Sequence, residues 1–350
     1  MNAKEKRASL LAVLAAALYS LTSPFSKILL SDIPPTLMAA LLYLGAGVGV
    51  LILMIIRGAV GGGKTETHIA KSDFPYVMGM VALDIAAPIL FMYGLENSNP
   101  ATVSLLGNFE IVATAFIAFI LFKEHISGRL WTAIFFITIS CILLSVELGA
   151  NYTLSLGSLL ALGATMCWGL ENNCTRMLSM RDPMEVVVIK GFCSGIGSLC
   201  IAALFGQMSS SLSHITVALL LGFVAYGLSI FFYVSAQRYL GAARTSAFYA
   251  VGPFIGVALS FFLFGTPPNV LFPIALPLMI VGTYLSSTKP HEHAHTHEPV
   301  THNHWHRHND GHHNHIHNGT VLGWHKHMHA HDPLGHSHEH CSFEHHHELN

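Results

Sequence analysis

The chain has 350 residues, of which 52% are hydrophobic and 10% are charged, and its formal net charge is −2. Ordinary soluble domains carry about 25% charged residues, so this composition excludes a typical soluble globular protein. Nothing in the composition supports nucleic acid as a partner.

Apolar stretches follow one another from the N-terminus to residue 287. A hydrocarbon layer about 30 Å thick is crossed by about 20 apolar residues in a helix. Each stretch must be helical, because an unpaired backbone group has no water to bind at that depth. We therefore predict an all-α, polytopic membrane bundle of ten transmembrane helices, with spans near 8–30, 35–56, 74–95, 102–122, 130–147, 156–177, 184–205, 215–234, 245–264 and 270–287.

Lysine and arginine are distributed unevenly between the two sides of this bundle. Of the 17 basic residues, 15 lie in segments that ten spans put on one side, and the other two, Lys27 and Lys190, lie inside spans. Basic loops remain in the cytoplasm. We therefore predict a multi-pass protein of the cytoplasmic (inner) membrane with both termini in the cytoplasm.

The chain contains an internal repeat. Leu11–Leu29 reads LAVLAAALYSLTSPFSKIL, and Leu160–Leu178 reads LALGATMCWGLENNCTRML, so that Tyr19 aligns with Trp168. Each copy has five spans, and an odd number means that the second copy enters from the opposite face of the membrane. Many secondary transporters use such an inverted repeat. We expect one repeat in residues 1–150, another in 151–288, and a separate tail in 289–350.

A second pair of segments resembles a known family. Phe91–Glu124 reads FMYGLENSNPATVSLLGNFEIVATAFIAFILFKE, and Phe231–Thr266 reads FFYVSAQRYLGAARTSAFYAVGPFIGVALSFFLFGT. Both resemble the signature of EamA-domain members of the drug/metabolite transporter superfamily. The resemblance implies a two-repeat, ten-helix fold that moves small organic molecules across the cytoplasmic membrane, often outward. There are departures, because Ile111 replaces the expected proline and Gly265–Thr266 lacks the closing glutamate.

Five ionisable side chains lie inside the predicted spans. An ionised side chain at the centre of a membrane helix costs roughly 2.5–3.5 kcal/mol, so such groups face the interior, pair or reach the interface. Lys27 and Lys190 are close to span ends, where their stems can extend to the interface. Asp84, Glu110 and Glu171 are too short for that, and we expect them to line the transport path or to form structural hydrogen bonds.

Glu171 lies in the most polar part of any span, next to Asn172 and Asn173. The matching stretch of the first repeat, 22–24, is also polar, and paired polar interruptions indicate a binding site in inverted-repeat transporters. Hydrogen bonds between helices and packing of aromatic rings are the alternatives. We predict a transport path, with one of its carboxylates carrying a coupling proton, formed by Asp84, Glu110, Glu171, Asn172, Asn173, Lys190, Tyr19 and Trp168.

The last 61 residues carry 22 of the chain's 25 histidines, mostly at alternate positions. Neutral imidazole binds Zn, Ni, Co and Cu ions well. The apolar residues of this tail are too few to form a core, so we expect disorder without metal. The predicted ligands of a divalent transition metal are His291, His293, His295, His297, His302, His304, His306, His308, His312, His313, His315, His317, His325, His327, His329, His331, His336, His338 and His340.

Three functions fit these features. The bundle exports a small metabolite while the tail senses or buffers metal, or the bundle transports the metal ion that the tail collects, or the protein is a membrane-tethered metal store. We favour the first. We find no nucleophile–base pair and no nucleotide site in the sequence that would indicate an enzyme. We expect transport itself to require no cofactor. The expected partners are the lipid bilayer, a small-molecule or ion substrate and metal ions; a homodimer is left open.

Overall fold

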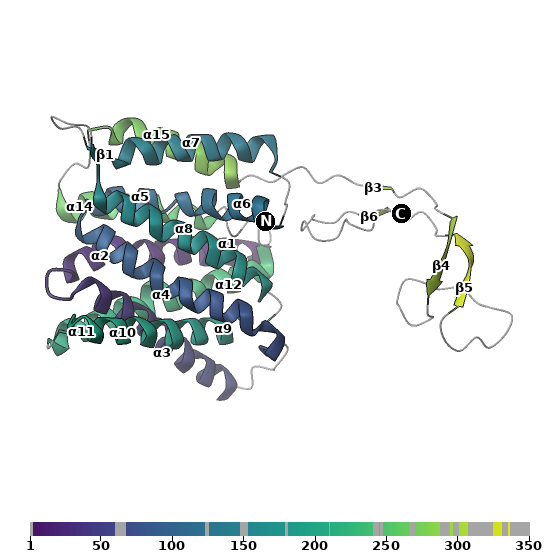
Figure 1. The fold of residues 1–350 in the computed structure, drawn as a ribbon, viewed down its shortest axis with the longest axis horizontal. Coiled ribbons are helices and arrows are strands. Elements are labelled where there is room, and N and C mark those ends of the chain that lie inside the picture. The colour runs from purple at the N-terminus through teal and green to yellow at the C-terminus, as the bar shows by residue number, and fades with distance from the viewer. Residues whose placement is uncertain are drawn as a thin grey trace. The chain divides into compact units, whose positions relative to one another are not determined.

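The structure is a computed structural model, and it describes residues 3–59, 68–122, 126–147, 153–178, 181–209, 211–240, 245, 248–265 and 270–287 of the helical part of the chain. In the tail it describes residues 295–296, 301–306, 325–330 and 335–336. The chain divides into two units, Met1–Thr288 and Lys289–Asn350. The first unit is a bundle of helices packed side by side (Figure 1).

The first half of the bundle consists of five spans. Two of them are interrupted, one at Leu21 and the other at Gly107–Asn108. Proline at the first position of α3 and of α5 suits a helix start, because its missing N–H would have no helical partner. In chain order the helices are α1 (Ala3–Ser20), α2 (Thr22–Leu29), α3 (Pro35–Ala59), the short 3-10 helix η1 (Lys71–Asp73), α4 (Phe74–Glu96), α5 (Pro100–Leu106), α6 (Phe109–Phe122) and α7 (Gly128–Ser145).

The second half repeats this order after a short antiparallel ladder between β1 (Val146–Glu147) and β2 (Thr153–Leu154). Two of its spans contain a π-helical segment, η2 and η3, where the backbone takes one extra residue per turn. In chain order the helices are α8 (Leu156–Met177), α9 (Pro183–Ile189), η2 (Lys190–Ser194), α10 (Gly195–Leu204), α11 (Leu212–Gly222), η3 (Phe223–Leu228), α12 (Ser229–Leu240), α14 (Gly252–Phe264) and α15 (Phe272–Ser287).

The ten predicted spans correspond to these helices, taken singly or end to end. Judged by length and composition alone, seven helical stretches in the described residues are long and apolar enough to cross a membrane. Two of the remaining predicted spans, α14 and α15, are apolar but shorter. The third, α8, has the required length, but Glu171, Asn172 and Asn173 make it more polar. The span that polar residues exclude from this set is thus the one with the predicted site.

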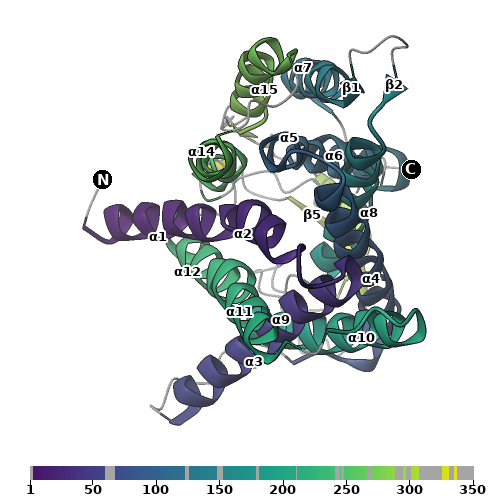
Figure 2. The same ribbon diagram turned by 90° about the vertical axis from the view of Figure 1, so that its left-hand side faces the viewer.

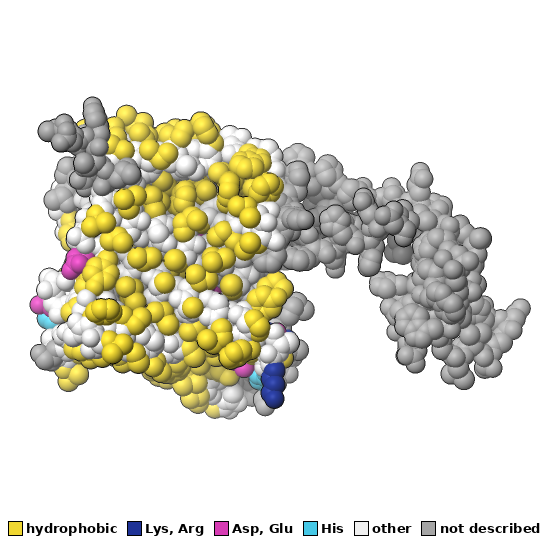
Figure 3. Space-filling model, in the orientation of Figure 1, with side chains coloured by type: hydrophobic (Ala, Val, Ile, Leu, Met, Phe, Trp, Pro, Cys, Tyr) yellow, Lys and Arg dark blue, Asp and Glu magenta, His cyan; other side chains and the backbone are white. Residues whose placement is uncertain are grey.

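The surface of the bundle is apolar, as expected for a protein surrounded by lipid. Figure 3 shows hydrophobic side chains over most of the visible face of the helices. Phe262 and Leu204 are 88% and 84% exposed, respectively, although in water such side chains would be buried. The chain is therefore a multi-pass membrane protein, whose described acidic and basic groups lie at the ends of the helices or inside the bundle.

Helices at matching positions of the two halves make matching contacts. The third span of each half packs on the first span of the other, as α4 packs on α8 and α12 on α1. The fourth spans do the same, since α6 packs on α8 and α14 on α1. The last helices of the two halves, α7 and α15, pack on each other along one side of the bundle (Figure 2).

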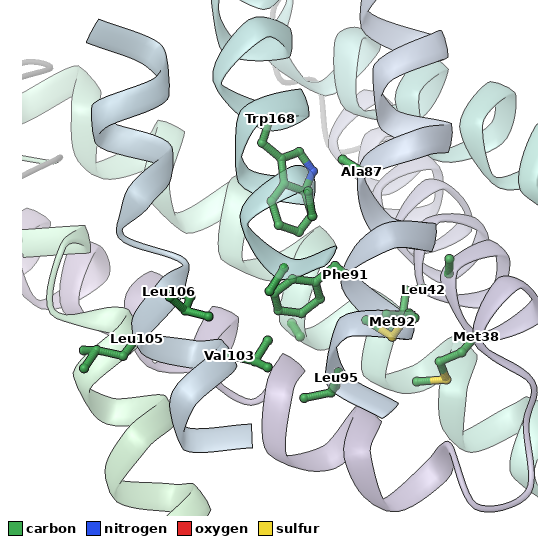
Figure 4. Close-up of a cluster of buried hydrophobic side chains, with 14 of the residues drawn as sticks. Met38, Leu42, Ala87, Phe91, Met92, Leu95, Val103, Leu105, Leu106 and Trp168 are labelled. Atoms are coloured by element: carbon green, nitrogen blue, oxygen red, sulfur yellow. The ribbon is translucent and has the colours of Figure 1, made fainter. Parts of the chain in front are cut away.

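The centre of the bundle is filled by a continuous cluster of buried side chains. Figure 4 shows part of it, with Trp168 of α8 above Phe91 of α4 and Met92 and Leu95 further along α4. Met92 and Leu95 are fully buried. Dense packing of this kind holds membrane helices together, because lipid gives no hydrophobic driving force between them.

Small residues let α3 and η2 approach closely. A Cβ built on Gly191 would lie 2.4 Å from the Cα of Gly47, and one built on Gly47 would lie 3.0 Å from the carbonyl carbon of Gly191. Glycine at both positions is therefore required by the contact itself. This contact matters for the site, because Lys190 immediately precedes Gly191.

In the tail, β4 (Thr301–His306) pairs with β5 (His325–Ala330), and β3 (His295–Thr296) pairs with β6 (Gly335–His336), both antiparallel. The disorder that we expected of the tail without metal stays a prediction. An alternating sequence suits an extended strand, because successive side chains point to opposite faces. A two-stranded ribbon alone is only marginally stable in water.

The glycine contact gives a stability prediction. Gly191→Val should lower the thermal unfolding temperature of the purified protein in detergent, because overpacking costs about 1–3 kcal/mol and this neighbour is backbone. Gly58→Val is the matched control, since a Cβ there meets nothing within 4 Å. Equal unfolding temperatures for the two variants would contradict the close approach of α3 and η2.

Candidate functional site

The site is built around the polar residues of α8. Consecutive residues of an α-helix are about 100° apart around its axis, so Glu171 and Asn172 face different neighbours. Glu171 faces η2, whereas Asn172 faces α6. A Cβ on Gly169 would lie 2.8 Å from the backbone nitrogen of Thr114, so the absence of a side chain there lets α6 approach α8.

Lys190 joins two buried carboxylates. Its Nζ lies 2.9 Å from Oε1 of Glu171 and 3.3 Å from Oδ2 of Asp84. The exposed fraction is 0% for Asp84 and 3% for Glu171. Two further hydroxyls complete the group: Tyr43 donates to Oδ1 of Asp84 at 2.9 Å, and Thr175 donates to Glu171. We call Asp84, Glu171 and Lys190 the acid–lysine triad.

The triad connects the two halves of the bundle. Asp84 belongs to α4 in the first half, whereas Glu171 and Lys190 belong to α8 and η2 in the second. Lys190 is also the first residue of a π-helical segment, a feature that often accompanies functional sites. A movement of one half relative to the other therefore changes the distances within the triad.

Glu110 lies beside the triad but has a different partner. The side-chain nitrogen of Asn172 donates to Oε1 of Glu110 at 2.6 Å and contacts Oγ1 of Thr114 at 3.3 Å. Asn173 instead donates to the backbone oxygens of Gly169 and Thr114, at 2.8 and 3.3 Å. Asn173 therefore holds α8 to α6, which is the structural alternative that we considered for this stretch.

A continuous row of tyrosine rings extends from the triad. Tyr43 contacts Tyr226 with ring centroids 5.5 Å apart, Tyr226 contacts Tyr19 at 5.9 Å, and Tyr19 contacts Tyr249 at 5.6 Å. We call these four residues the tyrosine row.

Sequence reasoning found Tyr19 but missed Tyr43 and Tyr226. Both lie near the middle of predicted spans, away from the interfaces where tyrosine is normally enriched. That mid-span position is a signal that could have found them. Trp168, which aligns with Tyr19 in the repeat, packs instead on Phe91 with ring centroids 5.2 Å apart, and is 7% exposed (Figure 4).

The two lysines inside spans behave differently. Lys190 turns inward to the triad, although its position near a span end also suggested the interface. Lys27 donates to the backbone oxygens of Leu95 and Glu96, at 2.7 and 2.8 Å. These oxygens lie at the C-terminus of α4, where a cation interacts favourably with the helix dipole. Lys27 is therefore a capping residue outside the triad.

The first repeat has a hydroxyl where the second has the carboxylate of Glu171. Thr22 and Ser26 of α2 align with Glu171 and Thr175, and both are buried. Their hydroxyls, like that of Tyr226, make no hydrogen bond with the described part of the chain. The two halves thus share a polar position, but only one half carries ionised groups there.

The predicted metal ligands of the tail lie largely outside the described residues, and the strands include eight of them by backbone position alone: His295, His302, His304, His306, His325, His327, His329 and His336. Elsewhere in the described chain no group of three or more His, Cys, Asp and Glu side chains could hold a metal ion.

Comparison with known proteins gives consistent matches over the bundle. The model of the EamA-like transporter family matches residues 6–146 and again residues 155–288. An uncharacterized transporter of Methanothermobacter thermautotrophicus (strain Delta H) is 22% identical over 287 residues, covering 78% of this chain and 84% of that protein. The uncharacterized transporter YyaM of Bacillus subtilis (strain 168) is 26% identical over 254 residues, covering 70% and 81%.

One solved structure, titled only as a crystal structure of a protein, has a TM-score of 0.59 and covers 80% of this chain and 95% of its own. Its sequence is 16% identical, so the likeness concerns the fold.

The triad gives a second stability prediction. Lys190→Met should destabilise the protein by about 3–5 kcal/mol, because it leaves two buried carboxylates without their cation. Adding Asp84→Asn and Glu171→Gln should recover most of that loss, since the uncompensated charges are then absent. Thermal unfolding in detergent measures both effects. Lys27→Met is the matched control, and a triple variant no more stable than Lys190→Met would contradict the pairing.

Proposed function

The chain belongs to the EamA-like transporter family, and from that premise we propose that it is a secondary transporter that exports a small metabolite across the cytoplasmic membrane. The single observation that carries this proposal is the acid–lysine triad. Ionised groups inside a membrane bundle are costly, and they typically belong to a substrate or proton pathway. A purely structural bundle would gain from hydrophobic side chains in their place.

The matching contacts of the two halves support an inverted repeat with a site between the halves. In the repeat alignment Gly169 matches Ser20 and Thr114 matches Gly256. Gly169 lies against Thr114, and a Cβ on Gly256 would lie 3.3 Å from the backbone oxygen of Ser20. Equivalent residues therefore meet in both halves. In transporters built this way, one half rocks against the other around a site near the middle of the membrane.

Contacts at both ends of α4 support alternating access. At its N-terminal end, Asp73 and Arg181 form an ion pair with an oxygen–nitrogen distance of 2.7 Å. At its C-terminal end, Gln207 donates a hydrogen bond to the hydroxyl of Tyr93. Both contacts join the first half to the second, so opening either end of the path requires one of them to break.

We assign the coupling proton to the triad. One lysine neutralises only one of two carboxylates, and a buried carboxylate without a counter-charge is stabilised by binding a proton. A proton that moves between the triad and either side of the membrane couples export to the proton gradient. The tail, in this proposal, is cytoplasmic and senses or buffers a divalent transition metal.

The register of β4 and β5 supports metal binding by the tail. His302 pairs with His329, His304 with His327, and His306 with His325. Positions two residues apart share a face of a strand, so these six positions lie on one face of the ribbon. Two neighbouring pairs comprise four histidine positions, the number of ligands that a tetrahedral zinc site takes. The same observation favours a second candidate function, in which the tail collects the ion that the bundle transports.

Proton coupling is testable at Glu171. Metabolite profiles of cells with and without the protein identify the exported compound, and its export is then measured in membrane vesicles between pH 6 and pH 8. Glu171→Gln should abolish the pH dependence, because glutamine neither binds nor releases a proton. Glu96→Gln, at an exposed helix end, is the control. Export by Glu171→Gln with the wild-type pH dependence would remove Glu171 from the mechanism.

Removal of the tail distinguishes the two candidate functions experimentally. Cells that produce the full protein, or the protein cut after Lys289, should export the same metabolite, and only the full protein should retain bound Zn, Ni or Co after purification. A change of cellular metal content that requires both the bundle and the tail would instead establish metal transport.

A further inference from the structure

The break between α1 and α2 leaves a carbonyl oxygen without its helical donor. In an α-helix each carbonyl accepts a hydrogen bond from the N–H of the residue four positions later. Four positions after Ser20 is Pro24, which has no N–H. The N–H of Phe25, the next along the chain, donates to Leu21 at 3.1 Å. The buried Ser20 is also the last residue of α1, at the end of a helix that attracts positive charge.

A hydroxyl from another helix lies close to this oxygen. A Cβ built on Gly256 of α14 would lie 3.0 Å from Oγ of Ser104, which belongs to α5, and 3.3 Å from the backbone oxygen of Ser20. Both oxygens therefore flank one point, and glycine places no side chain there. Ser104 is 7% exposed, and its hydroxyl forms no hydrogen bond with any described residue. We call Ser20, Ser104 and Gly256 the α1 break site.

The corresponding contact in the other half of the bundle has its own donor. In the repeat alignment Gly169 matches Ser20, and Asn173 matches Pro24. The side-chain nitrogen of Asn173 donates to the backbone oxygens of Gly169 and Thr114, at 2.8 and 3.3 Å. The first half has proline at the position of this donor. Because buried polar groups almost always have a partner, the oxygens of the α1 break site indicate a ligand that carries positive charge.

We propose that the α1 break site binds a sodium ion through the backbone oxygen of Ser20 and the hydroxyl of Ser104. Hard cations take oxygen ligands, and inverted-repeat transporters hold Na⁺ at the carbonyl groups and C-terminal ends of interrupted helices. A single ion suits two oxygens that flank the position of one carbon atom. The inference goes beyond the proposed function, which assigns the coupling proton to the acid–lysine triad.

A bound ion also affects the arrangement of the two halves. Ser20 and Ser104 belong to the first half, whereas Gly256 belongs to the second. The ion holds the end of α1 and the side of α5 together at the surface of α14. Sodium therefore stabilises the arrangement of these three helices that the structure shows.

Thermal unfolding tests for sodium binding without knowledge of the cargo. The full-length protein in lipid nanodiscs is heated in sodium, potassium or N-methylglucamine chloride at equal ionic strength, with a chelator that removes divalent metal from the tail. A ligand that binds only the folded protein raises its stability with concentration. Sodium chloride should raise the unfolding temperature to a plateau above the other two salts. No such rise, or an equal rise in potassium chloride, overturns the proposal.

Substitution of Ser104 locates the effect. Ser104→Ala should abolish the rise with sodium but leave the unfolding temperature in N-methylglucamine unchanged or higher, because alanine removes a buried hydroxyl that has no partner. Ser198→Ala is the matched control, since the hydroxyl of Ser198 on α10 is also buried without a hydrogen bond to any described residue. This control should retain the full rise. A full rise in Ser104→Ala overturns the assignment.

Substitution of Pro24 tests the second ligand and keeps the test available if Ser104→Ala fails to fold. Pro24→Ala restores an N–H that can donate to the oxygen of Ser20, in competition with the ion. The sodium concentration that gives half of the rise should then increase at least tenfold. An unchanged half-maximal concentration removes the oxygen of Ser20 from the site and overturns the proposal.

These outcomes are distinguishable from those that test the proposed function. A protein that sodium stabilises, but that moves no compound in proteoliposomes, supports the sodium site and contradicts the transporter. A protein that exports a metabolite, but whose unfolding temperature does not respond to sodium, contradicts the sodium site and leaves the transporter.

Discussion

The structure depends on one constraint, which is that ionised groups inside a membrane bundle must be compensated by the protein itself. The acid–lysine triad meets part of this requirement by bringing Asp84 from one half of the chain to Glu171 and Lys190 from the other, and a proton compensates the carboxylate that the lysine leaves. The cost of a lone charge in hydrocarbon then favours arrangements in which the halves remain in contact. Any movement between the halves changes the distances within the triad. The triad therefore both holds the two halves together and depends on the conformation of the bundle.

Much of the fold could be predicted from the sequence, because membrane spans follow from composition alone. Residues 35–56 and 74–95 were expected to be spans and correspond to α3 and α4. The expectation that Asp84 and Glu171 face inward rests on the same physics, since exposure to lipid would be too costly. The pairing of these residues could not be predicted. It depends on how far each helix is rotated about its axis, and that rotation is set by long-range packing.

Lys190 illustrates the difference. Its place near a span end allowed the side chain to reach the interface, but a π-helical segment begins at this residue and the lysine contacts two carboxylates. Single-sequence periodicity does not show a π-helical turn. Tyr43 and Tyr226 were missed for a related reason, because they and Tyr19 belong to segments far apart in sequence that only the fold brings together.

The central claim is that the polar cluster lies on a path open in turn to both sides of the membrane. Cysteine accessibility tests it most directly, with Asn172→Cys in a background without other cysteines and Phe262→Cys, at an 88% exposed position on the apolar surface, as the control. We predict that a water-soluble, membrane-impermeant thiol reagent modifies position 172 when applied from either side, and leaves position 262 unmodified. Protection of position 172 from both sides, or its modification from one side alone, would contradict the account.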